Sequence, residues 1–335
     1  MSGLAGERVP AVRIGVVGLG YWGPNLARNF GAIPGCELAW LCDASTDARG
    51  KLERLFPGAR STPDLAELLG DPTLDAVVLA TPVPTHAELA IAVAGAGKHC
   101  FVEKPLATTA ADAERAVTAA EQAGKILMVG HLLEYHPAVA RLKELVDGDE
   151  LGGLYYIYGN RLNLGKLRAD ENALWSLGAH DVSVALHLIG EEPLECLAHG
   201  ASYVRPDVQD VVFCYLRFPS GVVAHLHLSW LDPHKERRIT VVGAQKMATF
   251  DDMLIEGKLT IYDKGFDQDT RSWGEYLTRS GDTFSPQIPN LEPLRIECEH
   301  FIDCIRTGAI PRSDGHSGLR VVRVLEQLQR SLERP

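Results

Sequence analysis

The chain has 335 residues, of which 46% are hydrophobic and 23% charged, and its formal net charge at pH 7 is −11. This length predicts about two domains, and the hydrophobic share is ordinary for a globular protein with a sizeable core. The acidic balance, without any basic block, argues against a nucleic acid or an anionic membrane as partner and leaves a small molecule as the expected ligand.

We expect a cytoplasmic protein. The first ten residues hold no long apolar segment of the kind that a signal peptide needs, and we expect them to form a disordered leader. No stretch of the chain reaches the roughly 18 consecutive apolar residues of a membrane span. The seven cysteines stand singly, without a Cys-x-x-Cys pair, which predicts reduced and mostly buried thiols in a reducing compartment.

Strand and helix patterns alternate through the first 130 residues. Short apolar runs predict strands at 12–17, 36–42, 75–80, 99–102 and 126–129. Helical spacing of apolar residues and helix-ending glycines predict helices at 23–32, 45–56, 63–70, 84–96 and 109–123. This alternation is typical of an α/β architecture with a doubly wound parallel sheet, which we assign to a first domain of residues 1–130.

The turn after the first predicted strand carries a Gly-x-Gly-x-x-Gly pattern at Gly18, Gly20 and Gly23. In such a turn the first glycine allows the tight bend, the second lets the backbone approach a pyrophosphate, and the third lets helix and strand pack closely. The N-terminus of the following helix offers N–H groups to the same anion. Asp43 lies about 20 residues further on, where a carboxylate binds the ribose diol of NAD and repels the 2′-phosphate of NADP. We therefore predict a Rossmann-type NAD site, with a plain glycine-rich turn as the alternative.

A second loop at the ligand-binding edge follows the strand predicted at 75–80. In a doubly wound sheet, ligands bind outside the carboxyl ends of the strands. Thr81 and Pro82 stand at that position, and His86 lies just beyond them near the start of a predicted helix. We therefore place this loop at the ligand site, with an ordinary proline-rich turn as the alternative.

The strand predicted at 99–102 is followed by Glu103, Lys104 and Pro105. The residue before a proline is held extended, so the direction of the Lys104 side chain is constrained. A lysine at this edge can donate a hydrogen bond to a substrate hydroxyl and stabilise the alkoxide that forms as a hydride leaves. The alternative is an ion pair between Glu103 and Lys104 at the surface.

After Gly130 the pattern changes to long runs of period-2 alternation. These runs predict strands at 153–163, 195–203, 208–217, 221–229, 236–242 and 246–250. Helices are predicted at 137–147, 178–189, 293–307 and 315–332, and an irregular loop at 264–292. We assign residues 131–335 to a second, α+β domain built on a large, mostly antiparallel, open-faced sheet. The bare face of such a sheet must be covered, so we expect a homodimer or homotetramer through it.

Two polar clusters in the second half are candidates for chemistry. His180 and Asp181 open a predicted helix, where a histidine can act as acid, base or hydroxyl anchor; an N-capping or core histidine is the alternative. The other cluster gathers donors at a strand end and suits a carboxylate or a phosphate, with a solvated strand end as the alternative. It consists of Asn160, Arg161, Asn163, Lys166 and Arg168. No ligand spacing indicates a metal site.

Taken in order, these motifs resemble the Gfo/Idh/MocA oxidoreductases over nearly the whole chain, and Glu103-Lys104-Pro105 is the most specific part of the resemblance. The resemblance implies a Rossmann domain, an open-faced sheet domain through which subunits associate, and hydride transfer between a sugar or polyol carbinol and nicotinamide. It implies that Lys104 binds the reacting oxygen and that His180 is the candidate proton relay. The implied cofactor contacts are Gly18, Gly20, Tyr21, Trp22, Gly23, Asp43, Thr81, Pro82, His86, Glu103 and Lys104.

One position departs from the family pattern, because many members carry an aspartate four residues before the histidine, where this chain has Ser176. A serine cannot orient or tune a histidine by charge. Residues 21–26 and 171–181 resemble most a branch that oxidises nucleotide-linked sugars, such as at C3 of UDP-N-acetylglucosaminuronic acid. The implied substrate contacts are Arg161, Asn163, Lys166, Arg168, His180 and Asp181. The alternatives are a dehydrogenase of a free polyol or monosaccharide, of the inositol or glucose type, and a non-catalytic regulator that senses the dinucleotide.

Overall fold

The chain divides into two compact units. The first comprises Met1–Gly130 and Leu294–Leu319, and the second comprises His131–Pro293 and Arg320–Pro335. The sequence pattern predicts one second domain over 131–335, and the assignment of Leu294–Leu319 to the first unit differs from that prediction. The computed structural model describes all residues except 1–9, 166, 168–170, 269–275 and 334–335. The expected disordered leader therefore lies, except for its last residue, outside the described residues.

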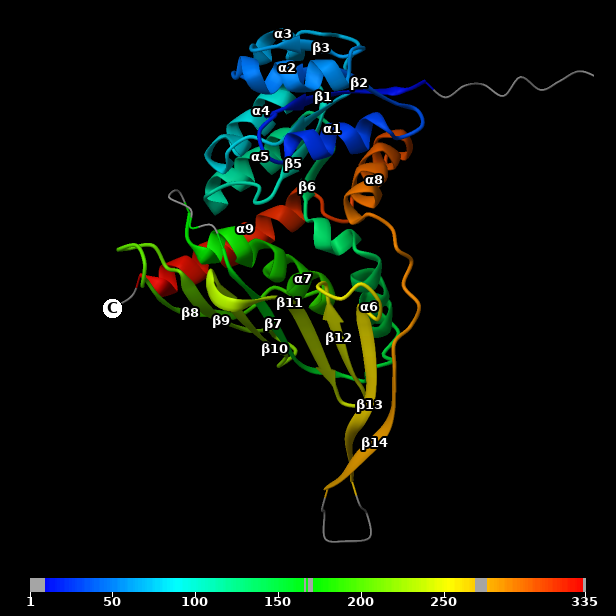
Figure 1. Cartoon of the computed structure of the whole chain (residues 1–335), viewed down its shortest axis with the longest axis vertical. Helices are drawn as coiled ribbons and strands as arrows, with labels where there is room; N and C mark the ends of the chain where they lie inside the picture. The colour runs from blue at the N-terminus through cyan, green and yellow to red at the C-terminus, as the bar shows by residue number, and fades with distance from the viewer. Residues whose placement is uncertain (1–9, 166, 168–170, 269–275, 334–335) are drawn as a thin grey trace, which may run out of the picture. The chain divides into compact units, whose positions relative to one another are not determined.

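The first unit is built on a six-stranded parallel sheet in the order β3-β2-β1-β4-β5-β6 (Figure 1). This order is that of the Rossmann fold. The strands are β1 Val12–Val17, β2 Cys36–Cys42, β3 Arg60–Thr62, β4 Ala76–Leu79, β5 His99–Glu103 and β6 Leu127–Gly130. Five were predicted at nearly these bounds; β3 was missed because three residues at a sheet edge carry too little periodicity.

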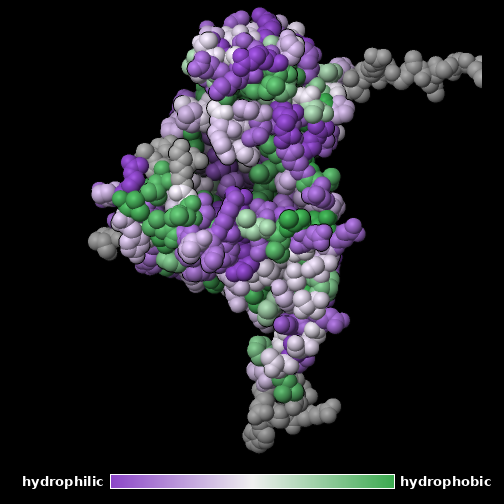
Figure 2. Space-filling view, viewed as in Figure 1, coloured by the Kyte–Doolittle hydropathy of each residue, from purple (hydrophilic) through white to green (hydrophobic). Residues whose placement is uncertain are grey.

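Helices connect the strands of this sheet and bury one side against it. They are α1 Gly23–Gly31, α2 Thr46–Leu55, α3 Leu65–Leu69, the short η1 Val83–Thr85, α4 His86–Gly95 and α5 Ala110–Gln122. Each lies within or overlaps a predicted helix. Hydrophilic residues predominate on the visible surface over α2 and α3 (Figure 2), while Leu52 and Leu68 of these helices are buried.

A helix from the far end of the chain completes the core of the first unit. In α8 (Pro293–Thr307), Phe301 packs edge-to-face against Phe30 of α1 and Phe101 of β5, with ring centroids 6.1 and 5.7 Å apart. The hydroxyl of Ser313 then donates a hydrogen bond to the carbonyl of Val129 at 2.6 Å. Local sequence pattern cannot show such a return, which is why the predicted domain boundary differed.

The second unit is built on an eight-stranded sheet in the order β14-β13-β12-β11-β7-β10-β9-β8. All neighbours are antiparallel except β7 and β10, which confirms the mostly antiparallel sheet that the alternation predicted. The strands are β7 Leu154–Leu164, β8 Glu195–Ala201, β9 Val211–Arg217, β10 Val223–Ser229, β11 Leu231–Gly243, β12 Met247–Asp251, β13 Leu259–Gln268 and β14 Tyr276–Phe284.

Helices cover one face of this sheet, and the core of the unit lies between them and the strands. The covering residues come from α6, α7 and the C-terminal part of α9. The helical elements are η2 Leu132–Tyr135, α6 Pro137–Asp147, the π-helix η3 Leu174–Gly178, α7 Ala179–Ile189 and α9 Gly315–Leu332, whose first residues belong to the first unit.

The prediction of an irregular loop over 264–292 was wrong at 264–268 and 276–284, while residues 269–275 lie outside the described residues. The second half of β13 and all of β14 fall there, and the two strands pair as an antiparallel hairpin at the sheet edge. Nearly every residue of β14 is exposed, so this strand shows no inward–outward alternation. Arg279 of β14 pairs with Asp263 and Asp267 of β13, so charge contacts accompany the pairing where an apolar face is missing.

The described residues were predicted to contain no membrane span, no disulfide and no metal site, and the structure bears on each of these points. In the described part of the chain, every helix is too short or too polar to cross a bilayer. All seven cysteines are described and all are free thiols. Among the described residues, no three or more His, Cys, Asp or Glu side chains converge in a way that would hold a metal ion.

Phe301→Ala should destabilise the protein by roughly 3–5 kcal/mol, because it removes one of the three mutually packed rings of the aromatic cluster in the first unit. Denaturant titration followed by circular dichroism measures this loss. The matched control is Phe266→Ala on β13, where the ring is 64% exposed, and its effect should stay within about 0.5 kcal/mol. Equal losses in both variants would contradict the place of α8 in this core.

Candidate active site

The glycine turn between β1 and α1 shows why each glycine is needed. Gly18 has a φ of +89°, and a Cβ on it would lie 2.6 Å from the backbone of Ala80. A Cβ on Gly23 would lie 2.0 Å from the carbonyl oxygen of Gly18, whereas a Cβ on Gly20 would meet no atom within 4 Å. The fold therefore requires Gly18 and Gly23, while Gly20 keeps open the space in front of the turn that a pyrophosphate needs.

The two aromatic residues of the turn differ in exposure. Tyr21 is 91% exposed, and its ring stacks beside that of Trp22 at 6.5 Å between centroids. Trp22 is half-buried and is the N-cap of α1, but it gives no side-chain capping hydrogen bond. The first turn of α1 is therefore not capped by a side chain, as suits an anion-binding helix N-terminus.

Asp43 follows β2 and is tied directly to the glycine turn. One carboxylate oxygen accepts a hydrogen bond from the backbone N–H of Leu19 at 2.6 Å, and the other accepts one from Ser45 at 2.8 Å. The guanidinium of Arg49 donates to the carbonyl of Asp43 at 2.5 Å. Sequence reasoning missed Arg49, although its place four residues after the N-cap Ser45 of α2 was a visible signal. The carboxylate is thus held beside the turn, where a ribose diol would be bound.

The buried side chain of His86 fixes the loop after β4 through contacts with two backbone carbonyl groups. The ring nitrogens of His86 lie 2.8 Å from the carbonyl oxygens of Thr81 and Pro105, and the side chain is 1% exposed. Burial lowers its pKa, although both carbonyl contacts oppose the shift. Both ring nitrogens therefore lie against backbone carbonyl oxygens, and the contact between His86 and the cofactor stays a prediction. Thr81 is half-buried and Pro82 exposed, so both remain at the surface of the loop.

Glu103 links the end of β5 to the glycine turn. Its carboxyl group accepts hydrogen bonds from the Trp22 side chain and, at 3.3 Å, from the backbone N–H of Lys104. Burial raises the pKa of Glu103 to about 7 against the opposing effect of the Lys104 charge. A Cβ on Gly130 would lie 3.4 Å from this carboxyl group, so the glycine at the end of β6 leaves room for it.

Lys104 thus stands between two fixed neighbours. Glu103 before it is joined to the glycine turn, and Pro105 after it is joined through His86 to the loop after β4. The Lys104–Pro105 peptide is cis, and Lys104 itself is half-buried. Three loops at the carboxyl edge of the sheet are therefore linked into one frame that carries a lysine.

In the second unit, His180 lies in the first turn of α7 and is half-buried. The hydroxyl of Ser183 donates a hydrogen bond to its backbone carbonyl at 3.0 Å. The preceding π-helix, which contains Ser176, was not predicted; such turns occur often at functional sites.

Two of the predicted substrate residues bind each other. Nε of Arg161 lies 2.5 Å and its second nitrogen 3.2 Å from the two carboxylate oxygens of Asp181, and both side chains are buried. Each buried charge is thus paired with the other, as a buried charge must be, and the role of these residues as substrate contacts stays a prediction. Asn163 is half-buried near the end of β7. Lys166 and Arg168 lie outside the described residues.

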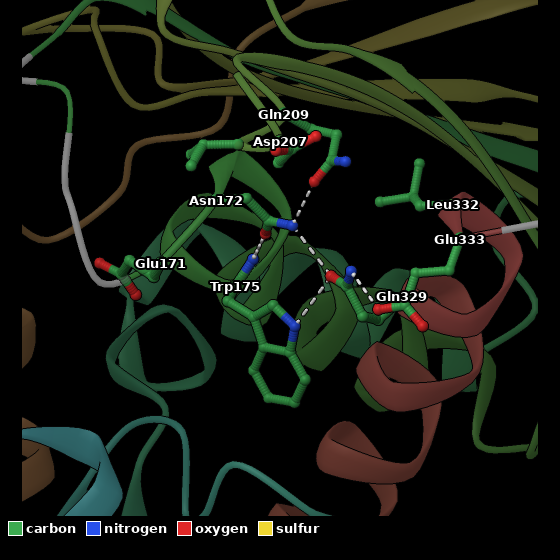
Figure 3. A pocket seen from close by; sticks show the side chains of 9 residues that line it. Glu171, Asn172, Trp175, Asp207, Gln209, Gln329, Leu332 and Glu333 are labelled. Carbon is green, nitrogen blue, oxygen red and sulfur yellow. Dashed lines mark hydrogen bonds between the residues drawn. The ribbon is translucent and has the colours of Figure 1, made fainter. Parts of the chain in front are cut away.

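A polar cavity of about 480 Å³ borders the segment that leads into η3 (Figure 3). Asn172 donates to the side-chain oxygens of Gln209 and Gln329, both at 2.9 Å, and the Trp175 indole donates to Gln329 at 3.2 Å. Sequence reasoning missed these contacts, since they join residues up to 157 positions apart. The cavity is lined by Glu171, Asn172, Trp175, Asp207, Val208, Gln209, Gln329, Leu332 and Glu333.

Comparison with known proteins agrees with this arrangement. Residues 12–131 match the model of an oxidoreductase family with an NAD-binding Rossmann fold, and residues 139–249 match the GFO/IDH/MocA C-terminal domain. The chain is 28% identical to myo-inositol 2-dehydrogenase of Thermotoga maritima, covering 96% of each protein. It is 27% identical to UDP-N-acetylglucosamine 3-dehydrogenase of Acidithiobacillus ferrooxidans, covering 96% of this chain and 97% of that one.

Two solved structures share the fold over nearly the full length. That of the Acidithiobacillus ferrooxidans enzyme, GnnA, superposes with a TM-score of 0.81 at 27% identity, covering 97% of this chain and 98% of that one. The GenD2 protein of gentamicin A biosynthesis, solved in complex with NAD, has a TM-score of 0.81 at 25% identity, covering 99% of this chain and 97% of that one.

Gly20→Ala should weaken NADH binding by about tenfold or more and leave the melting temperature of the cofactor-free protein unchanged, because the added methyl group enters only the space meant for the pyrophosphate. Gly23→Ala should lower the melting temperature itself, because its Cβ collides with the carbonyl of Gly18. Fluorescence titration with NADH and thermal unfolding measure the two effects. Equal melting losses in the two variants would show that the fold needs Gly20 as well.

Proposed function

Because the chain belongs to the Gfo/Idh/MocA family of oxidoreductases, whose N-terminal domain binds NAD, we propose that it oxidises a ring hydroxyl of a nucleotide-linked sugar. The observation that carries the proposal is the frame around Lys104. This lysine is held between the glycine turn and the loop after β4, at the sheet edge where NAD binds in this fold. The named relatives are dehydrogenases, so the chain is an enzyme, which goes against the alternative of a non-catalytic regulator.

The residues at the glycine turn fit NAD. Gly20 leaves the space for the pyrophosphate, the uncapped start of α1 faces that space, and the carboxylate of Asp43 is fixed for a ribose diol and against a 2′-phosphate. When bound, NAD supplies the acceptor for the hydride at its nicotinamide ring.

The remaining steps belong to side chains of this protein. Lys104 donates a hydrogen bond to the substrate hydroxyl and stabilises the oxygen as negative charge develops on it. The hydroxyl proton passes to His180 or to a water molecule that His180 holds, and the hydride leaves the same carbon, so the carbinol becomes a carbonyl. His86 and Glu103 act as positioning residues, because His86 contacts the carbonyl of Pro105 and Glu103 accepts a hydrogen bond from the backbone N–H of Lys104.

The relatives of this chain are named for substrates of different classes. One is named for UDP-N-acetylglucosamine and another for myo-inositol, at 27% and 28% identity. We favour a nucleotide-linked sugar because residues 21–26 and 171–181 resemble that branch, and because Asn163, Lys166 and Arg168 follow one another as donors. A free polyol is the second candidate, and the inositol dehydrogenases among the relatives support it.

The open face of the second unit is the proposed surface for self-association. On this face His227 of β10 stacks on Phe213 of β9, with ring centroids 4.4 Å apart, and Tyr156 stacks on Tyr158 along β7. Phe213 and Tyr156 are each 43% exposed. An exposed aromatic surface of this kind favours burial against a second copy of the chain.

Purified protein incubated with NAD and a panel of UDP-linked sugars, free inositols and glucose should form NADH with a UDP-linked sugar. Lys104→Met should lower kcat for that substrate by at least about 10²-fold, because the reacting oxygen loses its hydrogen-bond donor and its charge partner. NADH absorbance measures both results.

The matched control for this prediction is Lys51→Met, which removes an exposed lysine of α2 and should keep kcat. Turnover of free polyols alone would contradict the proposal that the substrate is a nucleotide-linked sugar. Near-native turnover in Lys104→Met would remove that lysine from the mechanism.

Phe213→Asp combined with Tyr156→Asp should convert a dimer or tetramer into a monomer, because two charges are placed on the aromatic face. Light scattering coupled to gel filtration measures the mass. Leu55→Asp, which adds a charge at an exposed position of α2, is the control and should keep the assembly. A wild-type monomer would contradict the proposal.

A further inference from the structure

The first turn of α7 continues directly from the π-helix η3, so its rotation is anchored by contacts outside the helix and not by a side-chain cap. Its N-cap is Gly178, which gives no capping hydrogen bond, and the segment before it is the π-helix η3. His180 is the second residue of α7. The direction of its imidazole therefore depends on what fixes the rotation of this first turn about the helix axis.

The buried ion pair of Arg161 and Asp181 supplies that anchor. Arg161 lies in β7, where its neighbours across the sheet are Leu228 of β10 and Arg237 of β11, so it belongs to the middle of the sheet. Its guanidinium holds both carboxylate oxygens of Asp181, at 2.5 and 3.2 Å. The residues are 8% and 2% exposed. A bidentate contact restricts rotation as well as distance, and a buried pair tolerates little misalignment.

The neighbourhood of Asp181 confirms which way this residue faces. The carboxylate is directed to the sheet, because it binds Arg161 of β7; burial and, after it, the charge of Asp181 raise the pKa of the Cys214 thiol on β9. Successive residues of an α-helix are turned by about 100°. Fixing Asp181 against the sheet therefore fixes the direction of His180, which is half-buried on a different side of the helix.

Two further contacts hold the segment before this turn. A Cβ on Gly178 would lie 2.9 Å from the Leu228 side chain, so the chain passes very close to β10. Asn172 accepts a hydrogen bond from the backbone N–H of Trp175 at 3.2 Å and is itself held by Gln209 and Gln329 (Figure 3). These contacts fix where the segment runs, and the ion pair fixes how the first turn of α7 is rotated.

We propose that Arg161 and Asp181 are positioning residues that set the direction and the charge environment of His180. Only the effect of the pair on kcat rests on the proposed function; its effects on the pKa of His180 and on the melting temperature do not. The pair is neutral as a whole, so its effect on the charge of His180 is small while both members are present. Removing one member leaves the opposite charge buried beside the histidine.

Other ionisable groups near α7 stay the same in every variant of the test. Glu134 of η2 lies 3.8 Å from His187 of α7, and Cys214 faces the helix from β9. Changes in the titration of His180 can therefore be read as effects of the pair.

The test compares Arg161→Met, Asp181→Asn and the double variant Arg161→Met with Asp181→Leu. The first readout needs no substrate: the pH dependence of His180 modification by diethyl pyrocarbonate, followed by peptide mass spectrometry. The His180 pKa should rise in Arg161→Met, where a carboxylate is left unpaired, and fall in Asp181→Asn, where a guanidinium is left unpaired. Shifts of about half a unit or more are expected, and the double variant should return to the wild-type value.

The second readout separates positioning from stability. Each single variant should lower the melting temperature, whereas the double variant should recover most of it, since apolar replacement of both members of a buried pair is often neutral. With the substrate found in the panel, kcat should stay at least about tenfold below wild type in the double variant, with KM for NAD unchanged. Arg161→Lys keeps the charge but not the two-point contact, so its kcat and melting temperature should lie between those of the wild type and those of Arg161→Met.

The matched control is Arg141→Met with Glu144→Leu, which removes an exposed ion pair of 3.0 Å on α6 and should change neither readout. Recovery of kcat together with stability in the double variant would overturn the positioning role. An unchanged His180 pKa in both single variants would overturn the electrostatic role. If the wild type turns over nothing in the panel, the proposed function fails, while the modification readout still decides the proposal through the pKa shifts.

Discussion

The contacts of Glu103 and His86 organise the first unit around one lysine. Each polar group joins backbone segments that are far apart in sequence: Glu103 joins β5 to the glycine turn, and His86 joins the loop after β4 to Pro105. Both side chains are polar groups removed from water, and such groups are stable only when hydrogen-bonded. The hydrogen bonds that these two side chains require therefore fix the positions of three loops relative to one another. Lys104 is positioned by its neighbours Glu103 and Pro105.

The second unit uses a buried charge pair where the first uses hydrogen bonds to the backbone. Arg161 belongs to a cluster of donors near a strand end that the sequence predicts to suit a carboxylate or a phosphate, whereas Asp181 stands at the start of a predicted helix. The structure buries both side chains and pairs them with each other. The same chemistry that suits a ligand thus serves to orient α7, and His180 with it.

Family membership and substrate choice rest on different parts of the molecule. Residues 12–131 match the model of the family's NAD-binding Rossmann domain, and within them Gly18 and Gly23 leave no room for a Cβ. Relatives named for myo-inositol and for UDP-N-acetylglucosamine stand at nearly equal identity. The shared fold therefore does not by itself decide the substrate.

The sequence by itself determined the features that local pattern encodes. Apolar runs and glycines placed nearly every strand and helix of the first unit, and the glycine turn, Asp43 and Lys104 were found because their spacing along the chain is their signal. Only the tertiary structure decided the partners of His86, Arg161 and Asp181, the return of α8 to the first core, and the β13–β14 hairpin. These depend on contacts between distant segments, or on pairing at an exposed edge without alternation, and neither leaves a periodic trace in the sequence.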